Sequence, residues 1–205
     1  LLLAFGVLLG RAVCGWLCPF GLLQELIHKI PSPKRKLKKG FLYIKYVVLV
    51  VFVLILPIAV TDYMGMGKPA FCQYICPAGT LEGGLSLLAA HESLRKAVGS
   101  LFSLKMTILI LTLIGCVFFY RFFCRTLCPL GAIYGLFNKI SIVHLEVDRH
   151  RCVGCGKCKD VCGMEVNPVQ TPNAAESIRC GACVDVCPAD ALYLGFSIKC
   201  KKNLP

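Results

Sequence analysis

Acidic residues are scarce in this sequence, which has 11 aspartates and glutamates against 23 lysines and arginines in 205 residues. The resulting formal charge of +12 would suit a nucleic-acid-binding protein, but the sequence contains no nucleic-acid-binding motif. Many of the bases stand beside apolar segments, where they orient a protein in a membrane. The positive charge therefore indicates a membrane surface rather than nucleic acid.

Two other features are also missing. The sequence has no C-x-x-C-H, and no two histidines share an apolar segment, so a haem site finds no support. No basic region precedes the apolar segment Leu1–Val13, and this segment is too short to cross a bilayer alone. We therefore expect Leu1–Val13 to be the end of a membrane helix that begins upstream, and not a signal peptide.

Apolar residues are abundant, at 57% of the chain with a mean hydropathy of +0.70, which is too apolar for an ordinary soluble domain. Residues 41–60 and 101–120 form two apolar segments, each long enough to give a helix of about 30 Å, the thickness of the bilayer hydrocarbon. We expect both to be membrane helices. Leu22–Ile30 has apolar residues at helical spacing, which predicts an amphipathic interfacial helix.

The 15 cysteines fall in groups with short, regular spacing, which indicates metal or redox chemistry in a reducing compartment. One run reads C-x2-C-x2-C-x3-C, and a second reads C-x2-C-x3-C-P. The cysteines of these two runs are Cys152, Cys155, Cys158 and Cys162, then Cys180, Cys183 and Cys187. This spacing is typical of bacterial ferredoxins with two 4Fe-4S clusters. Zinc is the competing interpretation of paired C-x2-C, but the tripled spacing favours iron–sulfur.

In such ferredoxins the fourth cysteine of each run reaches across to the other cluster. The first cluster then takes Cys152, Cys155, Cys158 and Cys187. The second takes Cys162, Cys180 and Cys183, and its fourth position falls on Ser177. A serine alkoxide is a harder ligand than a thiolate, so the second centre is expected to be a serine-ligated 4Fe-4S cluster, a 3Fe-4S cluster or absent. Cys200 is an alternative fourth ligand, but we expect it to be a free cysteine of the tail.

A C-x3-C-P motif occurs three times, at residues 14–19, 72–77 and 124–129. Cysteines four residues apart share one face of a helix, and two facing pairs could give four soft ligands to a metal centre. Cys14, Cys18, Cys124 and Cys128 are therefore candidate redox or metal ligands. Cys72 and Cys76 form the third, looser copy, which charge counting places on the outer side. Packing residues before a helix-breaking proline are the alternative, and Cys116 is expected to be a core residue.

Basic residues set the expected orientation. Lys34, Arg35, Lys36, Lys38 and Lys39 follow the first helix, so the positive-inside rule places this loop in the cytoplasm. The ferredoxin-like part then lies on the cytoplasmic side too. Lys45 is expected to extend toward the interface, and Arg11 and Arg121 to be interfacial anchors or to neutralise neighbouring thiolates.

These patterns predict an α-helical multi-pass membrane domain over residues 1–147, with helices near 1–13, 41–60 and 101–120. A small α+β two-cluster ferredoxin-like domain follows over 148–196, and a tail covers 197–205. Alternating residues over Ile142–Val147 predict a strand that leads into this domain, with a closing strand at Ala191–Phe196.

The ferredoxin run, Gly10–Pro19 and Cys124–Gly131 together resemble the polytopic membrane polyferredoxins. Their typical member is the membrane subunit of the quinol dehydrogenase that feeds periplasmic nitrate reductase. The resemblance implies an inner-membrane protein of a prokaryote that transfers electrons between quinol and a partner redox protein. Ser177, Gly163 after Cys162 and the third C-x3-C-P copy depart from the family pattern.

The function predicted on this basis is electron transfer between the quinone pool or a partner redox subunit and cytoplasmic 4Fe-4S clusters. Such a chain would be a subunit of an oxidoreductase complex with no catalytic residue of its own. Two alternatives remain: a copper-type metalloreductase that assists oxidase assembly, with copper at the C-x3-C pairs, and a membrane redox sensor.

Overall fold

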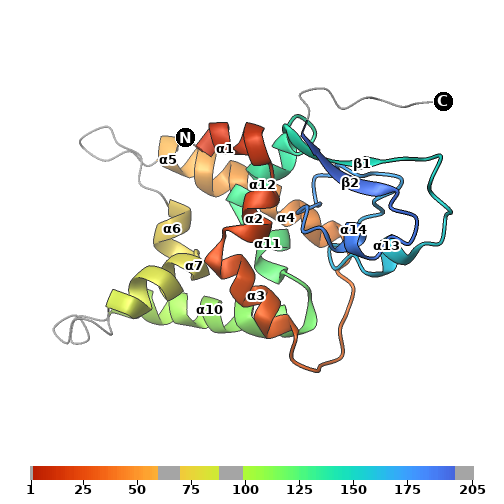
Figure 1. Cartoon of the computed structure of the whole chain (residues 1–205). Helices are drawn as coiled ribbons and strands as arrows, with labels where there is room; N and C mark the ends of the chain where they lie inside the picture. The colour runs from red at the N-terminus through yellow and green to blue at the C-terminus, as the bar shows by residue number, and fades with distance from the viewer. Residues whose placement is uncertain (1, 60–69, 88–98, 197–205) are drawn as a thin grey trace. The chain divides into compact units, whose positions relative to one another are not determined.

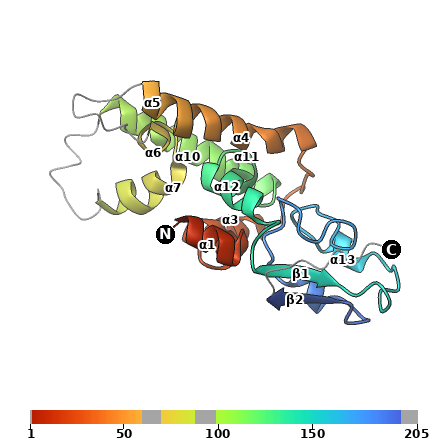
Figure 2. The same cartoon turned by 90° about the horizontal axis from the view of Figure 1, so that it is seen from above.

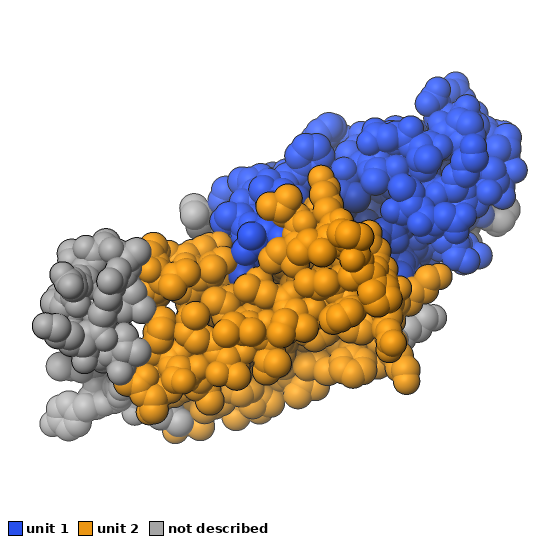
Figure 3. Space-filling view, turned by 90° about the horizontal axis from the view of Figure 1, so that it is seen from below, with its two compact units in different colours: residues 1–23, 130–205 blue, residues 24–129 orange. Residues whose placement is uncertain are grey.

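The computed structural model describes residues 2–59, 70–87 and 99–196, and it is mostly helical (Figure 1). The chain forms two compact units, coloured separately in Figure 3. Unit 1 comprises Leu1–Leu23 and Leu130–Pro205, and unit 2 comprises Gln24–Pro129. Val60 at the end of the predicted helix 41–60, Cys200 and the tail 197–205 lie outside the described residues.

Three helices open the chain: α1 (Leu2–Leu9), α2 (Ala12–Trp16) and α3 (Pro19–His28). The helix expected over Leu1–Val13 is interrupted at Gly10, which has φ +57° and donates its N–H to the carbonyl of Gly6 at 2.9 Å. A left-handed glycine after the last turn is a common way to end a helix. A side chain at Gly10 would also collide with Asn138, since its Cβ would lie 2.7 Å from Oδ1.

The ferredoxin-like part of unit 1 follows α12 (Pro129–Phe137) and contains two short helices and a two-stranded antiparallel sheet (Figure 2). These elements are β1 (Val143–Val147), α13 (Lys157–Asp160), α14 (Ala182–Asp185) and β2 (Leu192–Phe196). Val143 pairs with Phe196 and Val147 with Leu192, so both predicted strands are confirmed. Leu145, Cys158 and Leu192 form the buried core of this part, which surrounds the cysteine runs with apolar side chains.

Among the described residues of unit 2, two helices are long and apolar enough to cross a membrane. They are Gly40–Ala59, with a mean hydropathy of 2.6, and Ser100–Phe118, with a mean hydropathy of 2.2. The first is a continuous succession of η1 (Lys39–Tyr43), α4 (Ile44–Val48), the π-helical turn η2 (Leu49–Ile55) and α5 (Leu56–Ala59). The second is α10 (Ser100–Phe118). Most of their side chains face outward, which distinguishes them from the core helix of a soluble protein.

The loop before Gly40–Ala59 is fixed to the C-terminal end of α10. Arg35 donates its backbone N–H to the carbonyl of Phe118 at 3.0 Å, and Ser32 Oγ donates to that of Val117 at 2.9 Å. The exposed bases of this loop, which are Lys34, Arg35, Lys36 and Lys38, therefore lie at the same end of unit 2 as the last turn of α10. The remaining helices are α6 (Ala70–Tyr74), α7 (Pro77–Gly79), η3 (Thr80–Leu85) and α11 (Phe122–Thr126).

Helix α3 has the amphipathic pattern that its sequence predicts, but its polar face is the one that packs against protein. Gln24 is fully buried, and His28 Nδ1 lies 3.1 Å from the carbonyl oxygen of Cys116 in α10. Leu22 and Leu26 are 49% and 63% exposed. A helix that turns leucines outward and buries an amide is suited to an apolar solvent such as lipid.

Candidate iron–sulfur site

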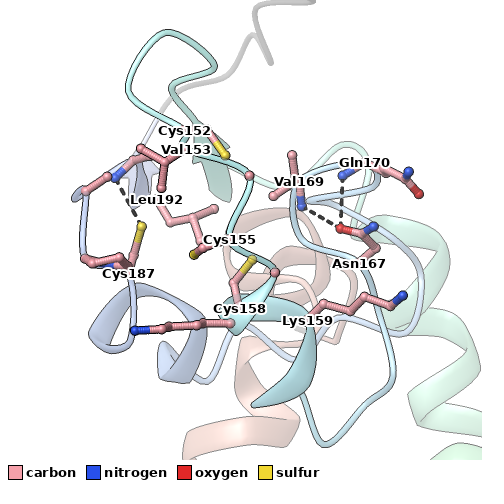
Figure 4. Close-up of a pocket in the computed structure, with 16 residues that line it drawn as sticks. Cys152, Val153, Cys155, Cys158, Lys159, Asn167, Val169, Gln170, Cys187 and Leu192 are labelled. Atoms are coloured by element: carbon pink, nitrogen blue, oxygen red, sulfur yellow. Dashed lines mark hydrogen bonds between the residues drawn. The ribbon is translucent and has the colours of Figure 1, made fainter.

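Four thiols of unit 1 surround one cavity of about 200 Å³. They belong to Cys152, Cys155, Cys158 and Cys187, the set that the crossover rule assigns to the first cluster (Figure 4). Cys187 Sγ also accepts the backbone N–H of Ala191 at 3.4 Å. The structure thus brings cysteines from both runs together, although Cys187 is distant from the other three in the sequence.

The two cysteine runs have the same local structure. Gly156 and Gly181 have φ of +78° and +87° and directly precede α13 and α14. Their carbonyls each accept two N–H groups of the following helix. This turn places Cys158 and Cys183 at the second position of each helix. A left-handed turn strains other residues, which explains a glycine at both positions.

Cys180 of the second run and Cys162 of the first run lie close enough to Cys183 to influence its thiol electrostatically. Burial, together with the neighbouring Cys180 and Cys162, raises the pKa of the Cys183 thiol to about 11, and burial is the largest cause. Burial likewise raises the pKa of Cys158. Without metal both thiols therefore stay protonated at neutral pH, and metal binding at either must release protons.

Ser177 occupies the position in the second run that Cys152 has in the first, because the offset relating Gly156 to Gly181 also relates these two residues. Its backbone is held on both sides: its N–H donates to Ala174 O at 3.0 Å, and its carbonyl accepts Asn138 Nδ2 at 2.6 Å. Ser177 is half-buried. The missing thiol is thus replaced by a hydroxyl on a fixed backbone.

The loop before Cys180 is held by buried polar side chains of the segment after α12 and of the turn before α2. Arg11 donates to the carbonyl of Ala175 at 2.6 Å and to Glu176 at 3.0 Å. Arg179 donates to Ser141 Oγ and to the carbonyl of Asn138, each at 2.6 Å. Arg11 is fully buried, so its interpretation as an exposed interfacial anchor is wrong: it cross-links the N-terminal helices to the ligand loop.

Gly15, inside the first C-x3-C motif, packs directly on this loop, since a Cβ there would lie 2.9 Å from Ile178 O. We predict that Gly15→Ala destabilises unit 1 by roughly 1–3 kcal/mol, because backbone atoms must shift to relieve the contact. The matched control is Gly83→Ala, at a helical glycine whose Cβ would meet nothing within 4 Å. Thermal unfolding of both variants in detergent checks this. An equal or higher midpoint for Gly15→Ala would contradict it.

The three C-x3-C-P copies share one backbone turn. The carbonyl of the residue before the first cysteine accepts two N–H groups, those of the residue before the second cysteine and of that cysteine itself. The acceptors are Val13, Phe71 and Phe123, and the second cysteines are Cys18, Cys76 and Cys128, with distances between 3.0 and 3.1 Å. The looser copy at Cys72–Cys76 is therefore a structural repeat of the other two.

This turn corrects the expectation that both cysteines of a pair lie on one helix. Helices α2, α6 and α11 end two residues before the second cysteine. Proline follows each second cysteine and disfavours helical backbone there, and Cys76 accordingly has an extended ψ of 107°. The second cysteine thus lies in a turn between two helices. Whether two pairs face each other stays a prediction, since Cys14 and Cys18 belong to unit 1 and Cys124 and Cys128 to unit 2.

The buried charged side chains of the described residues are all positive, and several of them lie near the C-x3-C-P motifs. They are Arg11, Lys45, Arg121, Arg125 and Arg179. Arg121 pairs with Glu25 at 2.6 Å and is 1% exposed, so it is no interfacial anchor, and Lys45 is buried rather than extended to an interface. Burying cations is costly unless anions lie nearby, and metal–thiolate centres are anionic. Arg11 and Arg121 each have a carboxylate partner, so their neutralisation of neighbouring thiolates stays a prediction.

Sequence reasoning missed Asn138, Arg179 and Gln24, which hold the ligand loop or contact a motif thiol. For Arg179 the sequence did offer a signal, because a charged residue directly before the predicted ligand Cys180 is unusual enough to suggest a specific partner. Cys116 is fully buried, as expected for a core residue.

The donor set fits an iron–sulfur cluster better than a single ion. Across residues 2–59, 70–87 and 99–196, no three Cys, His, Asp or Glu side chains are close enough to hold one metal ion. Four thiols spread around a cavity match the larger core of a cluster, and soft thiolates are the usual ligands of iron–sulfur clusters.

The cysteine runs around a common cavity, with the apolar helices, define an iron–sulfur protein of the polyferredoxin class, a class of electron-transport proteins. The chain belongs to the 4Fe-4S binding domain family, whose model matches residues 1–38, 46–95 and 104–145. A second family model, also described as a 4Fe-4S binding domain, matches residues 178–193. The first match contains all three C-x3-C-P motifs, and the second contains Cys180, Cys183 and Cys187.

Relatives are found in archaea and bacteria. An uncharacterized protein of Methanocaldococcus jannaschii is 31% identical, over 94% of this chain and 75% of its own length. Protein NirI of Paracoccus denitrificans is 30% identical, over 85% of this chain and 25% of its own. The ferredoxin-type protein NapH of Haemophilus influenzae is 24% identical, over 79% of this chain and 50% of its own. No solved structure matches.

Proposed function

We propose that this protein is a multi-pass membrane subunit that transfers electrons between the quinone pool or a partner redox subunit and 4Fe-4S clusters on the cytoplasmic side of a prokaryotic inner membrane. The observation that carries the proposal is the cavity with four thiols in a chain that also has two outward-facing apolar helices. The name of the NapH relative, a ferredoxin-type protein, supports the same class of function.

Cys152, Cys155, Cys158 and Cys187 would hold the first cluster, and Cys162, Cys180 and Cys183 the second, with Ser177 at its fourth position. A bound 4Fe-4S cluster supplies a reversible one-electron couple. The protein's part is to exclude water with the core around Cys158 and to donate the Ala191 N–H to Cys187 Sγ. Both features influence reduction potential.

The C-x3-C-P cysteines would supply a further metal–sulfur centre. Support comes from the family model, which covers these motifs and not the run at Cys152–Cys162, and from the buried cations near them. The proposed cytoplasmic orientation has its own support. The exposed bases of the loop before Gly40–Ala59 gather at the end of unit 2 where α10 finishes, as the positive-inside rule expects of a cytoplasmic end.

Quinol oxidation is tested with the full chain in lipid vesicles. We expect added quinol to bleach the visible absorbance of the clusters, with dithionite as the positive control for complete reduction. If dithionite bleaches the clusters and quinol leaves them oxidised, the quinone version is wrong. A partner-subunit route would then be tested by the same readout with a reduced donor protein.

Ligation at the motifs leads to a second expectation. The double variant Cys124→Ser, Cys128→Ser should lose most of the iron that is not accounted for by the ferredoxin-like part, because serine binds iron more weakly than thiolate. Iron and sulfide analysis measures this, with Cys116→Ala as a thiol-removing control that should keep its iron. Equal iron in wild type and double variant would refute a centre at Cys124 and Cys128.

A further inference from the structure

Gln24 lies at the junction of three helices of unit 2. It belongs to α3 and is fully buried. Its side chain contacts Cys116 in α10 as well as Phe123 and Cys124 in α11. An amide that is removed from solvent in a predominantly apolar unit requires hydrogen-bond partners for both ends. These contacts place the amide beside Cys124, the first cysteine of a C-x3-C-P motif.

These contacts fix which way the amide points. Oε1 accepts the backbone N–H of Phe123 at 3.1 Å and the thiol of Cys116 at 3.4 Å. Two donors on one side require the carbonyl oxygen there, because the amide nitrogen cannot accept. Nε2 therefore faces Cys124 and donates to its Sγ at 3.2 Å. The orientation follows from a backbone group that cannot rotate away, which makes the N–H···S contact a fixed property of the fold.

We infer that Gln24 is a positioning residue that raises the reduction potential of the centre bound at Cys124, by donating a hydrogen bond to the ligand sulfur. The inference rests on the proposed function, in which Cys124 is a metal ligand. Reduction adds negative charge that is shared by the ligand sulfurs, so a donor to sulfur favours the reduced state. The effect is strong here because the donor is buried, and buried hydrogen bonds are electrostatically stronger than exposed ones.

Cys116 has a different role in this arrangement from that of Cys124. Its thiol donates to Gln24 Oε1, whereas the sulfur of Cys124 accepts from Gln24 Nε2. Cys116 thus helps to orient the amide and is not itself a ligand. Phe123 N–H maintains the same orientation when Cys116 is removed, so loss of Cys116 affects the potential less than loss of Gln24.

The experiment is a potentiometric EPR titration of the full chain in detergent. Gln24→Met removes the donor with an unbranched side chain of similar length. Gln24→Asn keeps a buried amide but withdraws it from Cys124 by one methylene. We expect both to lower the ratio of reduced to oxidised centre at a fixed potential by about tenfold, which is about 59 mV for a one-electron couple.

Two references show that the effect is local. Gln73→Met makes the same replacement at a half-buried glutamine within the third motif copy and should leave the potential unchanged. The centre at Cys152–Cys187 in each variant reports on folding and should also keep its potential. A shift below twofold in either Gln24 variant with intact iron overturns the inference.

The iron content of Cys124→Ala tests the proposed function independently of Gln24. If Cys124→Ala has as much iron as the wild type, then no centre is bound at Cys124, and the premise fails before Gln24 is considered. Loss of iron in Cys116→Ala would also overturn the assignment, because Cys116 would then be a ligand rather than a donor.

Discussion

Cys158→Ala is expected to abolish the first 4Fe-4S cluster, with complete loss of its EPR signal and of the matching iron and sulfide. Cys158 is the buried member of the four thiols and contributes to the core with Leu145 and Leu192. The turn at Gly156 places Cys158 at the second position of α13, where its thiol lines the cavity. Since cluster binding is coupled to folding, the variant should also unfold at a lower temperature.

The matched control for Cys158→Ala is Val153→Ala, which shortens a side chain lining the same cavity without removing a thiol. This variant should keep its iron and its signal. A Cys158→Ala protein that retains a complete first cluster would refute the assigned ligand set.

Ser177→Cys should convert the second centre to a complete 4Fe-4S cluster. In the wild type we expect the second centre to give a 3Fe-4S signal or to be only partly occupied, because Ser177 has a hydroxyl at the position where the first run has the thiol of Cys152. If the wild type has a 3Fe-4S cluster, the Ser177→Cys protein should contain about one more iron per chain. The fixed backbone of Ser177 and the similar size of the two side chains allow the thiol to be added without rearrangement. Iron analysis with EPR of both proteins measures the change.

Ser177→Ala separates the remaining alternatives. If the wild type has a serine-ligated 4Fe-4S cluster, alanine should convert it to the three-iron form. If the hydroxyl is not a ligand, alanine should leave the signal as it is. Two complete, thiolate-only clusters in the wild type would contradict the expectation for Ser177→Cys and point to another cysteine as the fourth ligand.

Sequence reasoning was most successful where spacing alone determines structure. The alternation over Ile142–Val147 predicted a strand, and β1 occupies Val143–Val147. The ligand sets that the cysteine spacing assigns to the two clusters stay a prediction. Apolar length placed the two helices at Gly40–Ala59 and Ser100–Phe118. In each case the pattern reflects local geometry or the thickness of a bilayer, and neither depends on the details of side-chain packing.

The errors arose where a polar residue has a distant partner. Arg11 and Arg121 look like interfacial anchors because each ends an apolar stretch, but their carboxylate partners, Glu176 and Glu25, are far away in the sequence. The pattern over Leu22–Ile30 places Gln24 on the polar face of the predicted amphipathic helix, but Gln24 is buried. Periodicity identifies two faces of a helix, yet it does not say which face meets protein when the surroundings are apolar.

The long-range hydrogen bonds of α3 and Arg11 also have a consequence for biogenesis. Gln24 must wait for Phe123 and Cys124 to be synthesised before its buried amide is satisfied, and Arg11 must wait for Ala175 and Glu176. The N-terminal helices are made first, yet they complete their packing only after the last ligand loop has left the ribosome. A chain interrupted before the ligand loop would therefore leave the Arg11 guanidinium without its partners Ala175 and Glu176.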